Sequence, residues 1–152
     1  MTARRLTEGE IREASSCFTN HLDYAAVRIH DTKWFFLQPD TIAMAPRGAV
    51  HFPPACCRPD FSVDPDLMAW LVHELTHCWQ HQTGQWVMLR GIYERTYEYG
   101  PLTERSYFDR FNIEQQASIV EDLYRLSRGM KTRRGRGTLS AYQAVVPMTR
   151  PR

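Results

Sequence analysis

Two histidines four residues apart, with a glutamate directly after the first, carry the clearest chemistry in the chain: His73, Glu74 and His77 form an HExxH motif. Side chains four residues apart lie on one face of an α-helix, so both imidazoles can bind a single metal ion. Histidine nitrogen is a preferred zinc ligand, and a neighbouring carboxylate can take a proton from water at the metal. The motif predicts a hydrolytic zinc centre with Glu74 as general base, although cobalt or manganese could use the same ligands.

The residues around the motif favour the helix that it needs. Asp64 can cap the N-terminus, Pro65 suits the first helical position, Asp66 complements the helix dipole, and Gly84 can end the helix. At about 100° per residue the motif falls on a different stripe from the apolar arc. That arc consists of Leu67, Met68, Leu71, Val72, Leu75, Cys78 and Trp79. The helix can therefore pack into a core and still present the motif.

A catalytic zinc needs a third protein ligand and one open position. His81 continues the four-residue spacing but would lie about 12 Å along the helix axis from His73, too far to share an ion. The longer HExxHxxGxxH pattern also fails, because Gln80 and Thr83 stand where its glycine and third histidine should be. The chain therefore does not have a metzincin pattern.

The remaining solution takes a glutamate from a second helix downstream. Asn112 and Gln115 can form a capping box, and Gly129 can end the helix that they begin. Glu114, in the first turn, is the preferred third ligand, and Glu121, two turns further along the same face, is its competitor. Glutamates in the less regular chain between the helices are weaker candidates: Glu94, Glu98 and Glu104.

The order of elements predicts an α+β fold. Thr7 and Glu10 form a capping box for a first helix that runs to about Asn20. Four short apolar runs then read as strands of a small sheet: 26–29, 33–37, 41–44 and 49–52. Prolines bracket the last run, which favours an exposed edge strand that a peptide substrate could extend.

Length and composition predict one catalytic domain over residues 1–128, followed by a flexible basic tail over 129–152. The chain has 152 residues, is 43% hydrophobic and carries a net charge of +2. The tail gathers Lys131, Arg133, Arg134 and Arg136 among glycines, but no aromatic or base-reading pattern accompanies them, so we predict no nucleic-acid binding. No signal peptide or run of about 18 apolar residues is present, which predicts synthesis in the cytoplasm and no membrane span.

The cysteines do not form a metal-binding pattern. Cys17, Cys56, Cys57 and Cys78 lack CxxC spacing, so a four-cysteine zinc site is not expected. Cys78 falls on the apolar arc of the motif helix and is predicted to be a core residue, whereas disulfide formation by the others stays open.

The two motif blocks resemble a known family. The run 73–84, together with 112–122, is similar to small HExxH proteins of the Rhs-element and Vgr-related group, which is associated with bacterial type VI secretion. Segments 6–10, 23–24, 27–30 and 44–46 resemble the same group and the HExxH domains of contractile injection systems. The resemblance covers about residues 6–125. It implies a zincin-like metallopeptidase domain with zinc held by His73, His77 and Glu114, and Glu74 as general base. It also implies a polypeptide substrate, export by a type VI system, and secretion components or an immunity protein as partners.

Two roles stay open at the sequence level. Many glutamate zincins place an aspartate four residues after the ligand glutamate to orient a motif histidine, but here Ser118 holds that position. Asp122 or Asp109 could act instead. Peptide hydrolysis also needs a donor for the oxyanion; Tyr107 is the preferred candidate, with Tyr97 and Tyr99 as alternatives.

Two other classes of function fit the same motif. One is a zinc-bound, catalytically idle adaptor or cargo module of a secretion apparatus, and the other is a zinc amidase that acts on peptidoglycan. An idle domain could dispense with Glu74, so its presence favours an enzyme.

Overall fold

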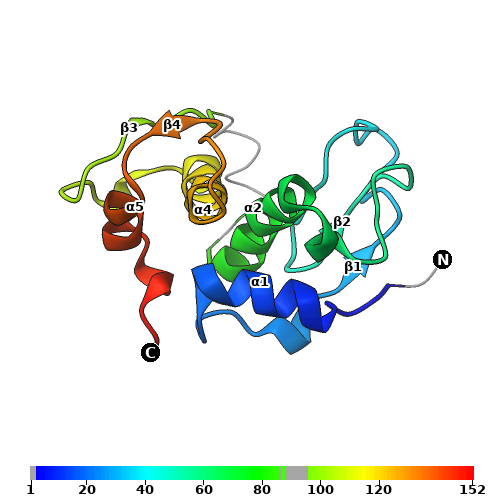
Figure 1. Cartoon of the computed structure of the whole chain (residues 1–152). Helices are drawn as coiled ribbons and strands as arrows, with labels where there is room; N and C mark the ends of the chain where they lie inside the picture. Colours follow the sequence, from blue (N-terminus) through cyan, green and yellow to red (C-terminus); the bar gives the residue numbers. More distant parts are fainter. Residues whose placement is uncertain (1–2, 86, 88–95) are drawn as a thin grey trace.

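The computed structural model describes residues 3–85, 87 and 96–152 (Figure 1). Within these residues the α-helices are α1 (Glu8–Phe18), α2 (Pro65–Gln82), α4 (Ile113–Ser127) and α5 (Leu139–Val145). Four strands of two residues each accompany them: β1 (Ile29–His30), β2 (Val50–His51), β3 (Gly100–Pro101) and β4 (Gly135–Arg136). The predicted mixed α+β class is confirmed, with most of the regular structure in helices.

Helix α2 begins and ends where the local sequence predicts. The Asp64 carboxylate accepts hydrogen bonds from the backbone N–H groups of Asp66 and Leu67, and Pro65 occupies the first turn. At the other end Gly84 adopts a φ of 86°, and its N–H and that of Gln85 return to the last turn of the helix. These bonds satisfy carbonyl groups that the helix end would otherwise leave unpaired.

Helix α2 lies in the middle of the molecule, with β1 and β2 on one side and α4 and α5 on the other (Figure 1). Its most extensive contacts are with α4. Apolar side chains of both helices join one core, in which Leu71, Leu75, Ile119 and Val120 are fully buried. Each such side chain stabilises the fold by roughly 1.5–3 kcal/mol. Because α4 covers the stripe that carries the motif, that stripe is buried as well.

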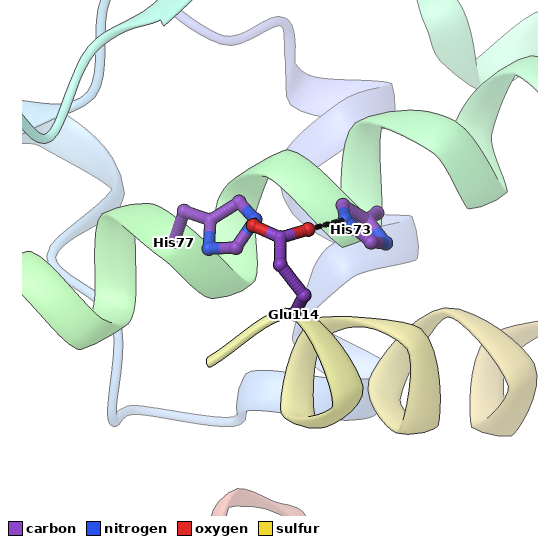
Figure 2. A group of neighbouring side chains, drawn as sticks. All are labelled: His73, His77 and Glu114. Carbon is purple, nitrogen blue, oxygen red and sulfur yellow. Dashed lines mark hydrogen bonds and ion pairs between the residues drawn. The ribbon is translucent and has the colours of Figure 1, made fainter. Parts of the chain in front are cut away.

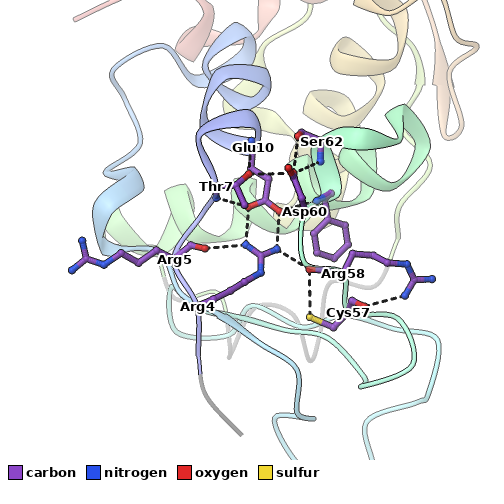
Figure 3. A network of polar contacts seen from close by, with 9 residues as sticks. Arg4, Arg5, Thr7, Glu10, Cys57, Arg58, Asp60 and Ser62 are labelled. Carbon is purple, nitrogen blue, oxygen red and sulfur yellow. Dashed lines mark hydrogen bonds and ion pairs between the residues drawn. The ribbon is translucent and has the colours of Figure 1, made fainter.

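A buried polar network fixes the chain just before α2 (Figure 3). The Glu10 carboxylate is fully buried and accepts two hydrogen bonds from the Arg4 guanidinium, at 2.9 and 2.7 Å. It accepts two more from the backbone N–H groups of Thr7 and Phe61, at 2.8 and 2.9 Å. Phe61 begins the short 3₁₀ helix Phe61–Val63 that leads into α2. The network therefore ties α1 to the start of the motif helix.

The sheet is smaller than predicted, and the prediction that residues 49–52 form an exposed edge strand is wrong. β2 pairs with β1 in parallel, and on its other side His51 forms an antiparallel bridge with Met44. Both sides of β2 are thus hydrogen-bonded, so a peptide has no free edge there. The run 33–37 forms bends and turns rather than a strand, and Phe36 is 85% exposed.

The prediction of a flexible tail after residue 128 does not fit the structure. Helix α5 and the 3₁₀ helix Pro147–Thr149 place Tyr142, Val146 and Met148 in the core. The Asp122 carboxylate of α4 also accepts hydrogen bonds from the backbone N–H groups of Arg133 and Arg134. The prediction was based on the basic, glycine-containing stretch and overlooked the apolar residues that follow it. These residues bury enough surface to hold the segment in place.

The remaining sequence expectations concern cysteines and membranes. All four cysteines carry free thiols, and Cys78 is buried in the core as predicted. Within the described residues, the helices are too short or too polar to cross a bilayer.

Candidate metal centre

Helices α2 and α4 bring three donor side chains together (Figure 2). The Glu114 carboxylate rises from the first turn of α4 between the imidazoles of His73 and His77. Its oxygens lie 3.4 Å from Nε2 of His73 and 3.0 Å from Nε2 of His77. The three donor atoms all lie within 4.8 Å of one another.

The spacing of these atoms is short enough for them to share one metal ion. Ligand bonds of roughly 2.0–2.1 Å to a tetrahedral zinc separate neighbouring donor atoms by roughly 3.3 Å. The two short distances, 3.4 Å and 3.0 Å, each involve a different oxygen of Glu114, and all three donor atoms lie within 4.8 Å of one another, so a modest inward shift of the side chains would let them share one ion. Two imidazole nitrogens and one carboxylate also leave a coordination position for a reactant. The cluster therefore fits the group that the motif implies, although its geometry does not select zinc over similar metals.

Opposite charges hold the histidines and the carboxylates together. Burial opposes protonation of His73, but the carboxylates of Glu114 and Glu121 outweigh it and raise the pKa of His73 to about 10. Burial likewise opposes protonation of His77, yet Glu114 raises its pKa. The pKa of Glu114 lies below its ordinary value because the two imidazoles outweigh the effect of burial. Because the pKa of each histidine is raised, a metal would compete with protons for these two rings.

Glu74 lies beside this cluster on α2 and is 5% exposed. Burial raises the pKa of Glu74, and the nearby charges of His73 and His77 offset part of that effect. A carboxyl group with a raised pKa binds a proton more readily than an ordinary glutamate, which suits a general base.

The other candidate ligands lie elsewhere. Glu121 is buried and faces Nδ1 of His73 at 3.3 Å, on the opposite side of the ring from Glu114. Its other oxygen lies 3.4 Å from the Arg133 guanidinium. Glu121 is therefore placed to act on His73 from outside the donor cluster. Glu98 pairs with Arg134, Glu104 is exposed, and Glu94 lies outside the described residues.

The groups that contact Nδ1 of His73 and Nδ1 of His77, the nitrogens that do not face Glu114, differ from those expected. Asp122 accepts a hydrogen bond from Tyr99 as well as the two backbone N–H groups described above, and Asp109 lies on the exposed face of the 3₁₀ helix Phe108–Arg110. Sequence reasoning missed Gln80, whose Oε1 lies 2.8 Å from Nδ1 of His77. The available signal was its position three residues after His77, which places both side chains on one helix face.

Of the three candidate tyrosines, Tyr97 lies nearest to the cluster. Its ring stacks on the His73 imidazole with the centroids 6.0 Å apart. Burial and the Glu114 carboxylate, to which its hydroxyl donates, raise the pKa of Tyr97 to about 12. Tyr107 is 68% exposed and its ring lies under the Arg110 guanidinium, whereas Tyr99 is buried against Asp122.

His81, which the helix geometry excludes as a ligand, lines a separate surface cavity of about 690 Å³. That cavity is also lined by His21, Asp23 and Arg47, and by no residue of the donor cluster.

Fold and site together define a small α+β domain in which two packed helices form a His–His–Glu cluster. No family model matches the chain. It is 33% identical over 130 residues to the type VI secretion system spike protein VgrG2b of Pseudomonas aeruginosa. The aligned segment covers 80% of this chain but only 13% of that protein. The solved structure of the effector domain of P. aeruginosa VgrG2b superposes with a TM-score of 0.79 at 30% identity, covering 94% of this chain and 81% of that domain. The chain belongs to the family of the VgrG2b effector domain.

Proposed function

We propose that this domain is a zincin-like, zinc-dependent metallopeptidase that acts as a type VI secretion effector. The observation that carries the proposal is the cluster of His73, His77 and Glu114 beside Glu74, in which the three donor atoms lie within 4.8 Å of one another. Membership of the VgrG2b effector-domain family supports the effector role. Export by a type VI system, contact with its components and control by an immunity protein are parts of the same proposal.

Each residue of the cluster has a distinct part in the proposed reaction. His73, His77 and Glu114 hold the metal, which supplies Lewis acidity toward water and toward the scissile carbonyl. Glu74 takes a proton from water and delivers it to the leaving amine, a transfer for which its raised pKa suits it. The products are a carboxylic acid and an amine, so the atoms of water and peptide balance.

Tyr97 replaces Tyr107 as the proposed donor to the oxyanion. Its hydroxyl lies against Glu114 and its ring against His73, so a small movement would bring the hydroxyl to a carbonyl at the metal. The raised pKa of Tyr97 keeps the hydroxyl protonated and able to donate. A substrate strand cannot add to β2, because both of its sides are already paired.

The test is metal content and cleavage of an unstructured protein such as casein, measured on the same samples. We expect wild-type protein to hold one zinc and to cleave, Glu114→Ala to lose both zinc and cleavage, and Glu74→Gln to keep zinc without cleavage. Glu104→Ala, which removes an exposed glutamate, is the matched control and should behave as wild type.

The opposite outcomes are equally informative. A wild-type protein that binds no metal would refute the proposal. A protein that holds zinc but cleaves nothing would contradict the casein-cleaving peptidase and favour the idle adaptor, or an amidase to be tested on peptidoglycan.

A further inference from the structure

Two buried glutamines join the motif helix to the ligand helix directly behind His77. Gln80 is 0% exposed and Gln116 is 5% exposed. Nε2 of Gln80 donates to the backbone carbonyl of Ile113 and to Oε1 of Gln116, both at 3.0 Å. Nε2 of Gln116 donates in turn to the carbonyl of Phe108 at 3.1 Å. Burying two amides is unfavourable unless they are hydrogen-bonded, and here both are.

The Phe108 carbonyl at the end of this series of hydrogen bonds determines the direction of all of them. The Phe108 carbonyl can only accept, so Gln116 must present its NH₂ there and its oxygen toward Gln80. Gln80 must then present its NH₂ to Gln116 and to the Ile113 carbonyl, because a reversed amide would set its oxygen against two other oxygens. The oxygen of Gln80 is left facing His77.

These directions determine which ring nitrogen of His77 carries the proton. An oxygen 2.8 Å from Nδ1 accepts a hydrogen bond, so the proton of the neutral ring sits on Nδ1. The lone pair is then on Nε2, the nitrogen that lies 3.0 Å from Glu114 in the donor cluster. The other tautomer would point an N–H into the cluster and could not bind a metal through that atom.

We propose that Gln80, held in place by Gln116, is a positioning residue that fixes His77 in its metal-binding tautomer and ring orientation. This inference rests on the proposed metal centre. His73 provides the contrast within the same site, because its Nδ1 faces the Glu121 carboxylate at 3.3 Å and not a neutral amide. The two histidines are thus held by different means, a neutral amide relay for His77 and a carboxylate for His73.

The experiment measures zinc affinity by competition with a chromophoric chelator at fixed pH. Gln80→Leu removes the acceptor, and we expect roughly 10- to 100-fold weaker binding, as for other residues that orient a ligand histidine. Gln116→Leu does not touch His77 but frees the Gln80 amide, so it should weaken binding in the same direction. Thr76→Val is the matched control, because the Thr76 hydroxyl is equally buried in α2 and bonds only to the Val72 carbonyl.

Gln80→Glu separates positioning from simple packing. It keeps an oxygen for Nδ1 of His77 but sets a carboxylate against two carbonyl oxygens, so it should destabilise the fold at least as much as Gln80→Leu. Zinc affinity should follow the opposite order, with Gln80→Glu tighter than Gln80→Leu. In parallel, long-range ¹H–¹⁵N spectra of the zinc-loaded protein should show the proton on Nδ1 of His77 in wild type. The signals of His77 should shift in Gln116→Leu, and those of His73 should not.

Two results would overturn the inference: Gln80→Leu binding zinc as tightly as Thr76→Val, or Gln80→Glu binding no better than Gln80→Leu. If Gln80→Leu does not fold, the comparison of Gln116→Leu with wild type decides the matter, because a relay requires weaker zinc binding there and unchanged binding refutes it. Failure of the metallopeptidase proposal looks different. Wild type would then bind no zinc, or it would bind zinc with the affinity differences described above and cleave nothing.

Discussion

Two glutamates in different regions of the molecule, Glu10 and Glu114, differ in the groups that surround their carboxylates. Glu10 receives four hydrogen bonds, two on each oxygen, from a guanidinium and two backbone N–H groups. These donors carry their protons at any ordinary pH, so the carboxylate is saturated. Glu114 instead faces imidazole nitrogens of His73 and His77, which donate only when protonated and otherwise present lone pairs. The Glu10 carboxylate is therefore satisfied by donors that always carry protons, whereas Glu114 faces donors that can exchange their protons for a metal ion.

The largest effect on folding is expected at the structural glutamate. Glu10→Ala leaves the partly buried Arg4 guanidinium and the backbone N–H groups of Thr7 and Phe61 without their acceptor. We expect a loss of about 3–5 kcal/mol in the free energy of unfolding, measured by urea denaturation. The folded fraction should still bind zinc with unchanged affinity. The exposed Glu8→Ala in the same helix is the control, and an equal loss there would contradict the comparison.

The metal-site glutamate should show the reverse pattern. Zinc at about 100 times its dissociation constant should stabilise wild type by about 2.7 kcal/mol, seen as a rise in melting temperature that EDTA abolishes. Glu114→Ala should lose that rise, because one of the three donors is gone. Glu10→Ala should melt earlier but show the same rise as wild type. A zinc-induced rise that survives in Glu114→Ala would mean that the ion binds elsewhere.

A smaller effect is expected where the C-terminal segment joins α4. The Tyr142 hydroxyl bonds to that of Tyr99, which donates to the Asp122 carboxylate. Tyr142→Phe removes one hydrogen bond and keeps the ring, so we expect a loss of about 1 kcal/mol in unfolding free energy. Limited proteolysis should cut within residues 129–152 sooner than in wild type. Unchanged protection would show that apolar packing of α5 alone holds the segment.

The smallest effect belongs to a third glutamate, at the surface. Burial would raise the pKa of Glu13, but the Arg128 guanidinium and the Tyr124 hydroxyl outweigh it and lower the pKa below its ordinary value of 4.5. A lowered pKa in the folded state contributes stability above the ordinary value, and that stability is lost as pH falls through the lowered one. Glu13→Gln should therefore cost less than about 1 kcal/mol at neutral pH. Urea titrations of both proteins should converge well below pH 4.5; a constant difference would contradict the ionic origin.

The features that sequence reasoning predicted well are those set by neighbours along the chain. The capping boxes of Thr7 with Glu10 and of Asn112 with Gln115 are both present, and Gly84 and Gly129 end their helices with positive φ. Helical spacing alone also placed His73 and His77 on one face. The meeting of Glu114 with both histidines, expected from the two-helix arrangement, is seen in the structure.

The features that sequence reasoning missed depend on contacts between distant segments. Whether the strand at 49–52 is an edge depends on Met44 bridging to His51, which no local pattern reveals. The order of the C-terminal segment depends on Tyr142 and Met148 reaching the core past a basic stretch. From the sequence, Gln80 is only the residue that breaks the metzincin pattern. Its place in a buried hydrogen-bond relay becomes visible only when the fold brings Gln116 beside it. Sequence reasoning likewise preferred Tyr107 to Tyr97, and only the fold shows that the ring on His73 is that of Tyr97.

The most direct test of the account is X-ray absorption of the zinc-loaded protein, with zinc content measured on the same sample. The account predicts one zinc per chain with two imidazole ligands and oxygen ligands at roughly 2.0–2.2 Å, and no sulfur. In His77→Ala the imidazole count should fall to one or the zinc should be lost. Zinc bound through cysteine sulfur, or no zinc in a folded wild-type protein, would contradict the claim that α2 and α4 pack together to build a metal centre.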